Sequence, residues 1–461
     1  MDPLTGKNVV VYGLAKSGLS AIKLLQREGA SITVIDKAPR EALGEAQRAV
    51  LEASSAALVG EAEAAGVLRS ADLVVVSPGV PLALPVLREA AAAGVEIIGE
   101  VELAWRHLPP APLFGITGTN GKSTTTALLG HLWTAAGKRP FVGGNLGEPL
   151  SEAVLATGGA WDAYVVELSS FQLEGSSTLR CDAAVILNLT PDHIDRYESH
   201  AHYGEAKARI FRNQRPTDAA VVNADDPAVP ALAFGSPARR YAFTRRGASP
   251  GEWELLASAD GASAFTLEGA RYELRNRALR GGHNLENAMA AALLARHGGL
   301  AARDIQNGLD TYGGLPHRIE SVATVRGVEW VNDSKATNVD STLVALSAFT
   351  PQPGSDQGPG VWLILGGKGK GAPYEPLVKA SRGVVKAVLT IGSDAPVIER
   401  AFANSLPIHS CGTLAAAVQL ASGAAVPGDV VLLSPACASY DQFRHFEHRG
   451  DTFKALVKGL S

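Results

Sequence analysis

The sequence predicts an α/β protein of three domains, each built on a mainly parallel sheet with helices on both faces. Short apolar runs such as 9–12 and 113–117 alternate with longer helical patterns, which is typical of strands buried between helical layers. The 461 residues are too many for one hydrophobic core, and breaks at 109–112 and 313–316 interrupt the pattern. We therefore expect a Rossmann-like N-terminal domain, a P-loop-type central domain and a Rossmann-like C-terminal domain, over residues 1–100, 101–313 and 314–461.

Each domain is expected to contain four or more buried strands. In the first domain they are expected at 9–12, 32–36, 73–76 and 95–98. In the second they are expected at 113–117, 164–168, 184–189 and 219–222, with an antiparallel addition over 252–275 and a closing helix at 284–296. In the third they are expected at 328–332, 361–365, 387–391 and 430–433, with a terminal helix within 441–458. Polar and glycine residues follow many of these strands directly, where open α/β sheets bind ligands.

The composition is that of a soluble globular protein. Hydrophobic residues make up 46% and charged residues 19% of the chain, and the formal net charge is −4. This charge argues against non-specific nucleic-acid binding, although a local basic pocket could still bind phosphates. We see no signal peptide and no stretch of roughly 18 apolar residues for membrane insertion, so we expect a cytoplasmic protein. Cys181, Cys411 and Cys437 lack zinc-site spacing and are expected to be reduced thiols.

The segment 118–124 has the composition of a phosphate-binding loop. It lies between an apolar strand and a helix rich in alanine and leucine. Glycines allow backbone N–H groups to approach phosphate oxygens, and the helix N-terminus adds positive potential. Lys122 can reach the β- and γ-phosphates of ATP, and the Ser123 hydroxyl suits Mg²⁺. The segment predicts nucleotide binding, which a hydrolase, a kinase and a ligase share, through Gly118, Thr119, Asn120, Gly121, Lys122, Ser123 and Thr124.

Two further clusters follow strands of the same predicted sheet. Glu167 stands at the end of a buried strand, where a carboxylate could complete a Mg²⁺ shell or be an ordinary paired glutamate. Asp192, His193 and Asp195 lie close together in a loop after the next strand. Histidine is an uncommon ligand for Mg²⁺ and more usual for Zn²⁺ or Mn²⁺, so the identity of the metal stays open.

Together these motifs resemble the central domain of the Mur ligase family. The resemblance rests on the loop at 118–124, the Glu-Leu-Ser-Ser-Phe-Gln-Leu run at 167–173 and the Thr-Pro-Asp-His-Ile-Asp-Arg-Tyr run at 190–197. In that family a lysine downstream of the histidine is carbamylated, and the matching residue is Lys207. The resemblance also implies that Asn145 contacts the substrate and Asn287 the adenine. It implies two Mg²⁺ ions, with Mn²⁺ as an alternative, held by Ser123, Glu167, His193 and carbamylated Lys207, and catalytic roles for Lys122, His193 and Lys207.

The third domain carries motifs that would select the amino acid. The resemblance places Arg318 near the ATP phosphates and Asp333 on the nucleoside. The Ser-Pro-Ala-Cys-Ala-Ser-Tyr-Asp-Gln-Phe run at 434–443 is similar to the branch that adds D-glutamate, and the Asp-Asn-Pro-Arg string of the branch that adds diaminopimelate or lysine is absent. A dianionic amino acid needs fixed donors and cations. The implied D-glutamate contacts are Lys335, Thr337, Lys370, Ser439 and Phe446.

The first domain opens with a loop that resembles a dinucleotide-binding turn without its second glycine. This loop is Gly-Leu-Ala-Lys-Ser-Gly at 13–18, and Asp36 ends the second strand, as a ribose-binding acid would. By themselves these residues indicate NAD, but beside the Mur resemblance they fit UDP better. The implied contacts to the UDP substrate are Lys16, Ser17, Asp36, Ser77, Pro78, Gly79 and Asn145.

The resemblance covers nearly the whole chain and implies a monomeric ligase of small molecules. The γ-phosphate would move to the alanyl carboxylate of UDP-N-acetylmuramoyl-L-alanine, and the amine of D-glutamate would attack the acyl phosphate. The sequence does not identify the base that takes the amine proton. A folylpolyglutamate synthase shares this chemistry but lacks a UDP-reading first domain. A nucleotide-binding scaffold without turnover would not need Glu167, His193 and Lys207.

Overall fold

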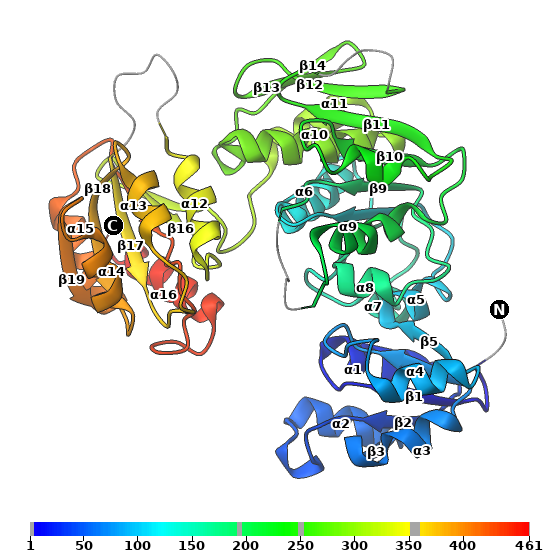
Figure 1. Ribbon diagram of the computed structural model, residues 1–461. Coiled ribbons are helices and arrows are strands. Elements are labelled where there is room, and N and C mark those ends of the chain that lie inside the picture. Colours follow the sequence, from blue (N-terminus) through cyan, green and yellow to red (C-terminus); the bar gives the residue numbers. More distant parts are fainter. Residues whose placement is uncertain (1–3, 191–195, 248–252, 351–359, 461) are drawn as a thin grey trace. The chain divides into compact units, whose positions relative to one another are not determined.

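Residues 4–190, 196–247, 253–350 and 360–460 are described by a computed structural model (Figure 1). They form three sheets of five, nine and six strands. The chain divides into two compact units, one of Met1–Glu273 with Glu286–Leu309 and one of Leu274–Leu285 with Asp310–Ser461. The first unit holds the five- and nine-stranded sheets, and the second holds the six-stranded sheet. Among the residues described, no helix is both long and apolar enough to cross a membrane.

The five-stranded sheet of the N-terminal domain is parallel throughout, in the order β3-β2-β1-β4-β5. Side chains on opposite faces of β1 enter two different core clusters. Val9 and Val11 belong to one cluster, and Val10 and Tyr12 belong to the other. Burial on both faces explains why this strand is an unbroken apolar run. The elements are β1 Asn8–Tyr12, α1 Lys16–Arg27, β2 Ser31–Ile35, α2 Glu45–Ser54, β3 Ala57–Val59, α3 Ala64–Arg69, β4 Leu73–Val76, α4 Pro85–Ala92 and β5 Glu96–Gly99.

The nine-stranded central sheet has the order β14-β13-β12-β11-β10-β9-β6-β8-β7. Its pairs are parallel from β7 to β12, and only the last two pairs, β12–β13 and β13–β14, are antiparallel. The predicted antiparallel addition is therefore a continuation of the main sheet. The elements are β6 Leu113–Thr117, α6 Lys122–Ala135, β7 Pro140–Gly144, α7 Leu150–Leu155, β8 Ala163–Glu167, α8 Ser170–Glu174, β9 Ala183–Ile186, α9 His200–Ala208, β10 Ala219–Asn223, β11 Arg239–Thr244, β12 Leu255–Ala259, β13 Ala264–Leu267, β14 Ala270–Glu273, α10 Gly282–His297 and α11 Ala302–Thr311.

The six-stranded C-terminal sheet has the order β15-β16-β20-β17-β18-β19, and only β15 is antiparallel. Both faces are again buried, since Leu363 and Ile364 of β17 enter separate core clusters. The elements are β15 Glu320–Val325, β16 Val328–Asn332, α12 Val339–Ser347, β17 Val361–Gly366, α13 Glu375–Ser381, β18 Val385–Ile391, α14 Ala395–Phe402, β19 Ile408–Gly412, α15 Leu414–Ala424, β20 Val430–Leu433 and α16 Phe446–Lys458.

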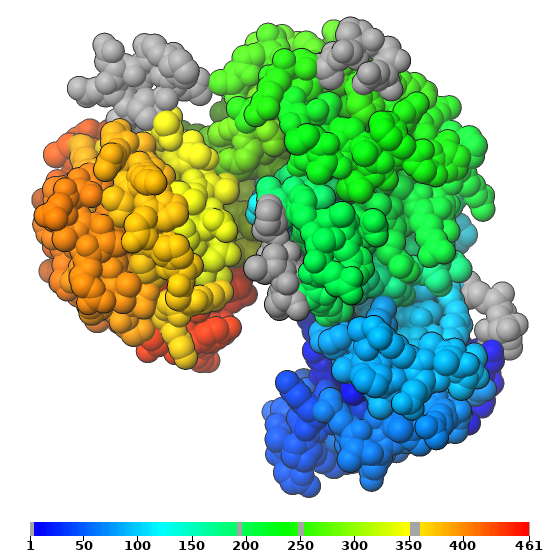
Figure 2. All heavy atoms as spheres, in the orientation of Figure 1, coloured from blue at the N-terminus to red at the C-terminus, as the bar shows by residue number. Residues whose placement is uncertain are grey.

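Within the first unit, one hydrophobic core runs through both the N-terminal and the central domain. Ile22 and Leu25 of α1 share a core cluster with Leu150 and Val154 of α7. In Figure 2 the blue surface of the N-terminal domain accordingly continues into the cyan and green surface of the central domain. The two domains are thus fused along an apolar face.

Polar contacts run along the edge of the same α1–α7 contact. Ser20 Oγ donates to Glu152 Oε1 at 2.6 Å, and Lys23 Nζ reaches the same oxygen at 3.1 Å. Arg27 Nη1 donates to the carbonyl of Val154 at 2.6 Å. Such pairs add little free energy where they are exposed, but they set the register of one helix on the other.

The helix that joins the two domains, α5 (Glu100–Trp105), is fixed by two buried glutamates. Glu102 accepts backbone amides of Ser177 at 3.0 Å and Leu179 at 3.0 Å. Burial raises the pKa of Glu102, but hydrogen bonds from Thr178 and Arg106 outweigh this effect, and the net pKa is lowered. Glu102 is therefore an ionised anchor of the linker.

Glu100 behaves differently, because only one of its oxygens has a partner among the residues described. Its Oε1 accepts the Ser151 amide at 2.6 Å, and Oε2 is buried without a hydrogen bond. Burial raises the pKa of Glu100 to about 7, against the opposing effect of Ser151. The linker therefore contains an acid that takes up a proton near neutral pH.

Replacing Glu100 with glutamine should flatten the pH dependence of stability. Folded Glu100 holds its proton more tightly than the unfolded chain does, so its contribution to the free energy of unfolding is lost as the pH rises from about 4.5 to about 7. Glutamine cannot ionise and still offers an oxygen to Ser151. The unfolding temperature is measured at about pH 5 and at about pH 8. The difference between these two temperatures should be a few degrees smaller in Glu100→Gln than in the wild type. Glu89→Gln, at an exposed carboxylate on α4, is the control, and an unchanged pH profile in Glu100→Gln would contradict the raised pKa.

Candidate active site

The loop between β6 and α6 has a shape that requires glycine at two positions. Gly118 and Gly121 have φ values of +148° and +84°. A Cβ on Gly121 would lie 2.4 Å from Asn287 Oδ1, and one on Gly118 would lie 3.0 Å from the Leu187 Cβ. Neighbouring segments therefore approach the backbone of this loop too closely for a side chain. Such a bare backbone, followed by the start of α6 with Ser123 and Thr124, suits contact with phosphate oxygens.

Two lysines converge on one carbonyl oxygen of this loop. Lys122 Nζ donates to the carbonyl of Gly118 at 2.9 Å and to that of Thr119 at 2.8 Å. Lys207 Nζ, from α9, donates to the same Gly118 oxygen at 2.8 Å. The Lys207 side chain is only 1% exposed, and its Nζ lies 4.5 Å from the centre of the Tyr203 ring. The Gly118 carbonyl thus accepts hydrogen bonds from two lysine side chains, one of them fully enclosed beside the phosphate loop.

A buried carboxylate lies at the end of the neighbouring strand β8. Glu167 Oε1 accepts Asn145 Nδ2 at 2.7 Å, and the Glu167 carbonyl accepts the Asn145 amide at 2.9 Å. Glu167 Oε2 is buried and has no hydrogen-bond partner in the described part of the chain. An oxygen of this kind fits a ligand of a divalent metal. The geometry thus brings two sequence-predicted residues, Glu167 and Asn145, into direct contact.

The predicted adenine contact, Asn287, also lies at the phosphate loop. It is 5% exposed on α10, and its Oδ1 accepts the Thr125 hydroxyl at 3.2 Å. The same oxygen approaches Gly121, as the close distance to a Cβ there shows. Asn287 therefore packs against the first turn of α6.

The loop that contains His193 falls outside the described residues 4–190 and 196–247. Just after it, Arg196 lies 3.9 Å from the centre of the Phe171 ring and donates to the Pro78 carbonyl at 3.2 Å. Arg196 also pairs with Glu174 at 3.4 Å. Sequence reasoning assigned no role to this arginine, which links the N-terminal domain to α8. The only sequence feature that pointed to Arg196 was its place in the run at 190–197.

The predicted uridine pocket is assembled from three turns of the N-terminal domain. Asp36 Oδ2 accepts the Leu14 amide at 2.7 Å, and its Oδ1 accepts the Ala38 amide at 2.8 Å. Ser77 Oγ donates to the Gly13 carbonyl at 2.8 Å. These bonds hold the turns after β1, β2 and β4 together at one edge of the sheet.

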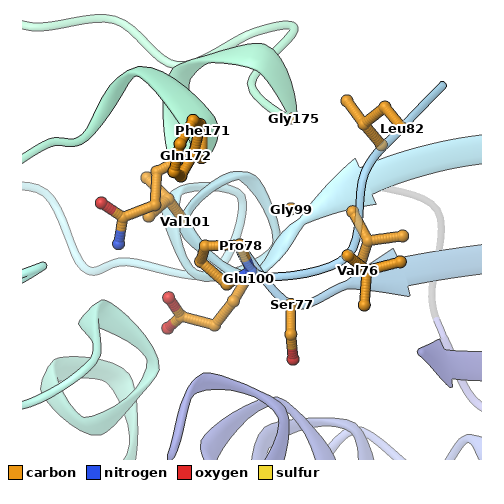
Figure 3. Close-up of a pocket in the computed structure, with 11 residues that line it drawn as sticks. Val76, Ser77, Pro78, Leu82, Gly99, Glu100, Val101, Phe171, Gln172 and Gly175 are labelled. Atoms are coloured by element: carbon orange, nitrogen blue, oxygen red, sulfur yellow. The ribbon is translucent and has the colours of Figure 1, made fainter. Parts of the chain in front are cut away.

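Other members of the predicted uridine set lie at the border with the central domain. Lys16 Nζ donates to the Gly147 carbonyl at 2.8 Å and pairs with Glu148 at 3.1 Å. Ser17 lies in the first turn of α1, and Gly79 directly follows Pro78. Figure 3 shows a small pocket at this border, with Ser77 and Pro78 on one side and Phe171 and Gln172 of α8 on the other.

In the second unit, Asp333 is a buried acid at the end of β16. It accepts Ser434 Oγ at 2.7 Å and the Ile319 amide at 3.2 Å. Burial raises its pKa to about 7, while the Ser434 hydrogen bond and the charge of Arg318 act in the opposite direction. Arg318 and Asp333, two of the predicted nucleotide contacts, therefore lie near each other.

The predicted amino-acid contacts of the second unit lie on the segments that follow β16, β17 and β20 and at the start of α16. Lys335 and Thr337 follow β16, where the Lys335 amide donates to the His317 carbonyl at 3.0 Å. Lys370 is an exposed side chain after β17, whereas Ser439, after β20, is only 2% exposed. Phe446 begins α16, and its carbonyl accepts Ser334 Oγ at 2.8 Å.

One buried arginine that sequence reasoning left without a role connects these loops. Arg449 of α16 is 1% exposed, and it donates to Ser334 Oγ at 2.9 Å, to the Ser334 carbonyl at 2.8 Å and to the Cys437 carbonyl at 3.1 Å. Burial lowers its pKa to about 10, so it remains charged at neutral pH. Its place shortly after the run at 434–443 was visible in the sequence, but its burial was not.

Comparison with protein families identifies the architecture. Three family descriptions match in order: "Mur ligase MurD-like, N-terminal domain" at residues 7–99, "Mur ligase middle domain" at 116–295 and "Mur ligase, glutamate ligase domain" at 317–437. The chain is 58% identical over 461 residues to a UDP-N-acetylmuramoylalanine–D-glutamate ligase of Myxococcus xanthus, covering 99% of each chain. It is 53% identical to the protein of that name from Anaeromyxobacter dehalogenans, covering 98% of each.

Solved structures share the fold at low identity. A UDP-N-acetylmuramate–alanine ligase from Thermotoga maritima matches with a TM-score of 0.58 and 18% identity, covering 99% of this chain and 100% of that one. MurF from Acinetobacter baumannii matches with a TM-score of 0.61 and 15% identity, covering 98% and 93%.

The chain belongs to the Mur ligase family. It is a three-domain, ATP-dependent ligase that forms amide bonds and requires a divalent metal. Its substrates are small molecules. The predicted fold class is confirmed by the three sheets and the three matching domains.

Proposed function

We propose that the protein joins D-glutamate to UDP-N-acetylmuramoyl-L-alanine at the expense of ATP, a step of peptidoglycan precursor synthesis. The observation that carries this proposal is the full-length similarity to ligases that bear this name, at 58% and 53% identity. The buried Glu167 and Lys207 and the half-buried Lys122, near one glycine loop, supply the chemistry that such a reaction needs. A reaction that consumes ATP and a nucleotide-linked precursor suits the cytoplasm, where we place the protein as a monomer.

We assign the phosphate loop to ATP. Its residues 118–121 and the start of α6 would surround the phosphates, with the Lys122 ammonium neutralising charge on the γ-phosphate as it moves. Asn287 would contact the adenine, and Arg318 and Asp333 of the second unit would contact the phosphates and the nucleoside. When bound, two Mg²⁺ ions, or Mn²⁺ in their place, would withdraw charge from the phosphate oxygens.

The metal ligands are assigned to Ser123, Glu167, His193 and Lys207. Glu167 Oε2 is buried without a hydrogen-bond partner among the described residues, which supports the assignment of Glu167 because an unpaired carboxylate oxygen is costly. Within the described segments no group of three or more His, Cys, Asp or Glu side chains gathers, and Mg²⁺ takes several oxygen ligands. A carbamate on Lys207, formed when its neutral amine adds CO₂ and releases a proton, provides such oxygens. It also removes one of the two ammonium groups at the Gly118 carbonyl.

The two remaining substrates, the UDP-linked precursor and D-glutamate, are assigned to the N-terminal and the C-terminal domain. UDP would contact Lys16, Ser17, Asp36, Ser77, Pro78 and Gly79, with Asn145 directed at the rest of that substrate. D-glutamate would be held by Lys335, Thr337, Lys370, Ser439 and Phe446. The γ-phosphate then passes to the alanyl carboxylate with release of ADP, and the D-glutamate amine attacks the carbonyl carbon and expels phosphate. The attacking amine loses a proton in that step.

The proposal is tested by phosphate release from ATP in the presence of UDP-N-acetylmuramoyl-L-alanine and a panel of amino acids. D-glutamate should support phosphate release and amide formation, whereas L-alanine, L-lysine, diaminopimelate and L-glutamate should not. Efficient turnover with any of these and none with D-glutamate would overturn the assignment.

Changing Lys370 to alanine should raise the KM for D-glutamate much more than the KM for ATP. The lost charge-assisted hydrogen bond to a carboxylate is worth about 1.5–3 kcal/mol, or roughly a 10- to 150-fold rise in KM. Lys368→Ala, at an exposed lysine two positions away, is the matched control. Equal KM values for D-glutamate in the wild type and Lys370→Ala would remove Lys370 from the site, and a rise in Lys368→Ala alone would transfer the role to Lys368.

A further inference from the structure

The segment after β9 runs alongside the phosphate loop beyond the end of the sheet. The Leu187 amide donates to the Thr117 carbonyl at 3.0 Å, and the Thr119 amide donates to the Asn188 carbonyl at 3.1 Å. Thr119 Oγ1 donates to the Thr190 carbonyl at 3.1 Å and also lies 3.1 Å from the Thr190 amide. These contacts extend the pairing of β6 with β9, in which Thr117 is opposite Ile186. The loop therefore rests against residues 187–190 along its length.

The Asn188 side chain makes a second set of bonds within this contact. Its Oδ1 accepts the Asn120 amide at 2.8 Å and the Thr119 amide at 3.1 Å, and its Nδ2 donates to the Asn120 carbonyl at 3.1 Å. Only a side chain with an acceptor and a donor side by side can make all three bonds, and among residues of this size only asparagine has both.

These bonds decide how the loop can meet phosphate. The amides of Thr119 and Asn120 are directed at Asn188, and the Gly118 and Thr119 carbonyls accept lysine ammonium groups. The donors available to phosphate include those from Gly121 into the first turn of α6, where backbone N–H groups have no partner within the helix. Asn188 thus fixes the orientation of the backbone of Thr119 and Asn120.

We propose that Asn188 is a positioning residue, which holds residues 118–121 in the shape that receives the ATP phosphates. The inference rests on the proposed function, because it assigns ATP to this loop. Asn188 does not need to touch the nucleotide to act in this way. A loop that must be ordered by the ligand binds it more weakly than one ordered beforehand.

Two variants separate the geometric role from general stabilisation. Asn188→Ala removes all three side-chain bonds. Asn188→Asp keeps the size and the acceptors, but it replaces the donor to the Asn120 carbonyl by an oxygen and adds a negative charge beside the phosphates. We expect the Kd for ADP and the KM for ATP to rise about tenfold in Asn188→Ala and further in Asn188→Asp. The KM values for UDP-N-acetylmuramoyl-L-alanine and D-glutamate should change less than twofold.

Asn223 provides a matched control at the end of the next strand, β10. It is 5% exposed, its Nδ2 donates to the Leu187 carbonyl at 3.1 Å, and its Oδ1 accepts the Asp225 amide at 3.0 Å. It therefore supports the same segment as Asn188, through bonds that do not involve residues 118–121. Asn223→Ala should lower the unfolding temperature as Asn188→Ala does, and it should leave the Kd for ADP unchanged.

The outcomes distinguish this inference from the proposed function. ADP binding by the wild type, measured by titration calorimetry, tests whether this protein binds the nucleotide at all. If the wild type binds ADP and both Asn188 variants bind it equally well, the positioning role is wrong while the ATP site stands. If Asn223→Ala weakens ADP binding as much as Asn188→Ala, the effect comes from the general stability of this region and the inference is likewise overturned.

Discussion

Replacing Lys207 with alanine is expected to remove most of the ligase activity, on the order of 100-fold, while the protein remains folded. The side chain is buried beside the phosphate loop, where its Nζ shares the Gly118 carbonyl with Lys122. As a carbamate it would supply oxygen ligands to the metal, and alanine supplies none. The measurement is the rate of phosphate release at saturating substrates, with circular dichroism to confirm the fold.

Chemical rescue makes this prediction specific. If carbamylated Lys207 is a metal ligand as proposed, alanine would leave a cavity where that ligand stood, so acetate or formate at millimolar concentration should restore part of the rate to Lys207→Ala. The wild type should lose activity when CO₂ and bicarbonate are stripped from the buffer. Lys138→Ala, at an exposed lysine, is the control and should respond to neither treatment. Turnover at the wild-type rate in Lys207→Ala without added acid would eliminate the role.

Glu167→Gln is expected to reduce activity by a similar factor, and the loss should depend on the metal concentration. Glutamine keeps the shape of the side chain, and its carbonyl oxygen can still accept Asn145 Nδ2. The change replaces one carboxylate oxygen by an amide nitrogen, which is a donor and a poor metal ligand. The Mg²⁺ concentration for half-maximal activity should therefore rise at least about tenfold.

A magnesium titration of the phosphate-release rate measures this shift. Glu148→Gln, which changes an exposed carboxylate after the Asn145 turn, serves as the control. If Glu167→Gln lowered the maximal rate without any change in the magnesium dependence, Glu167 would act on the substrate and not on the metal.

Most interior strands could be predicted from the sequence because both of their faces are buried. Runs such as Leu73–Val76 of β4 and Val430–Leu433 of β20 contain only apolar residues, which is typical of a central parallel strand. The interior strand β11 was missed, because its sequence Arg-Arg-Tyr-Ala-Phe-Thr begins with two exposed arginines and has no such apolar run. The edge strands β3, β7, β15 and β19 were not predicted. They are short or carry polar and glycine residues, as β19 does with the sequence Ile-His-Ser-Cys-Gly, because one side of an edge strand faces solvent.

The candidate site could be predicted wherever its residues follow a strand in a recognisable run. Glu167 and Asn145 were found separately, and the structure adds that they form a hydrogen bond. Contacts between segments far apart in the sequence could not be predicted, because nothing in the sequence near Lys16 or Asn188 specifies their partners. The bond from Lys16 to Gly147 spans 131 residues, and those from Asn188 span 68 and 69.

The core shared by α1 and α7 limits how the chain could be recombined with its relatives. An N-terminal domain cannot be exchanged as an independent module, because the exchange would pair a foreign α1 with the native α7 and leave Ile22, Leu25, Leu150 and Val154 mismatched. A working chimaera would need its junction after α7, so that α1 stays with α7 and Glu100 stays with Ser151, and it would also need residues 177–179 that still donate to Glu102. Evolution faces the same constraint, and we expect substitutions in α1 and α7 to be correlated among related ligases.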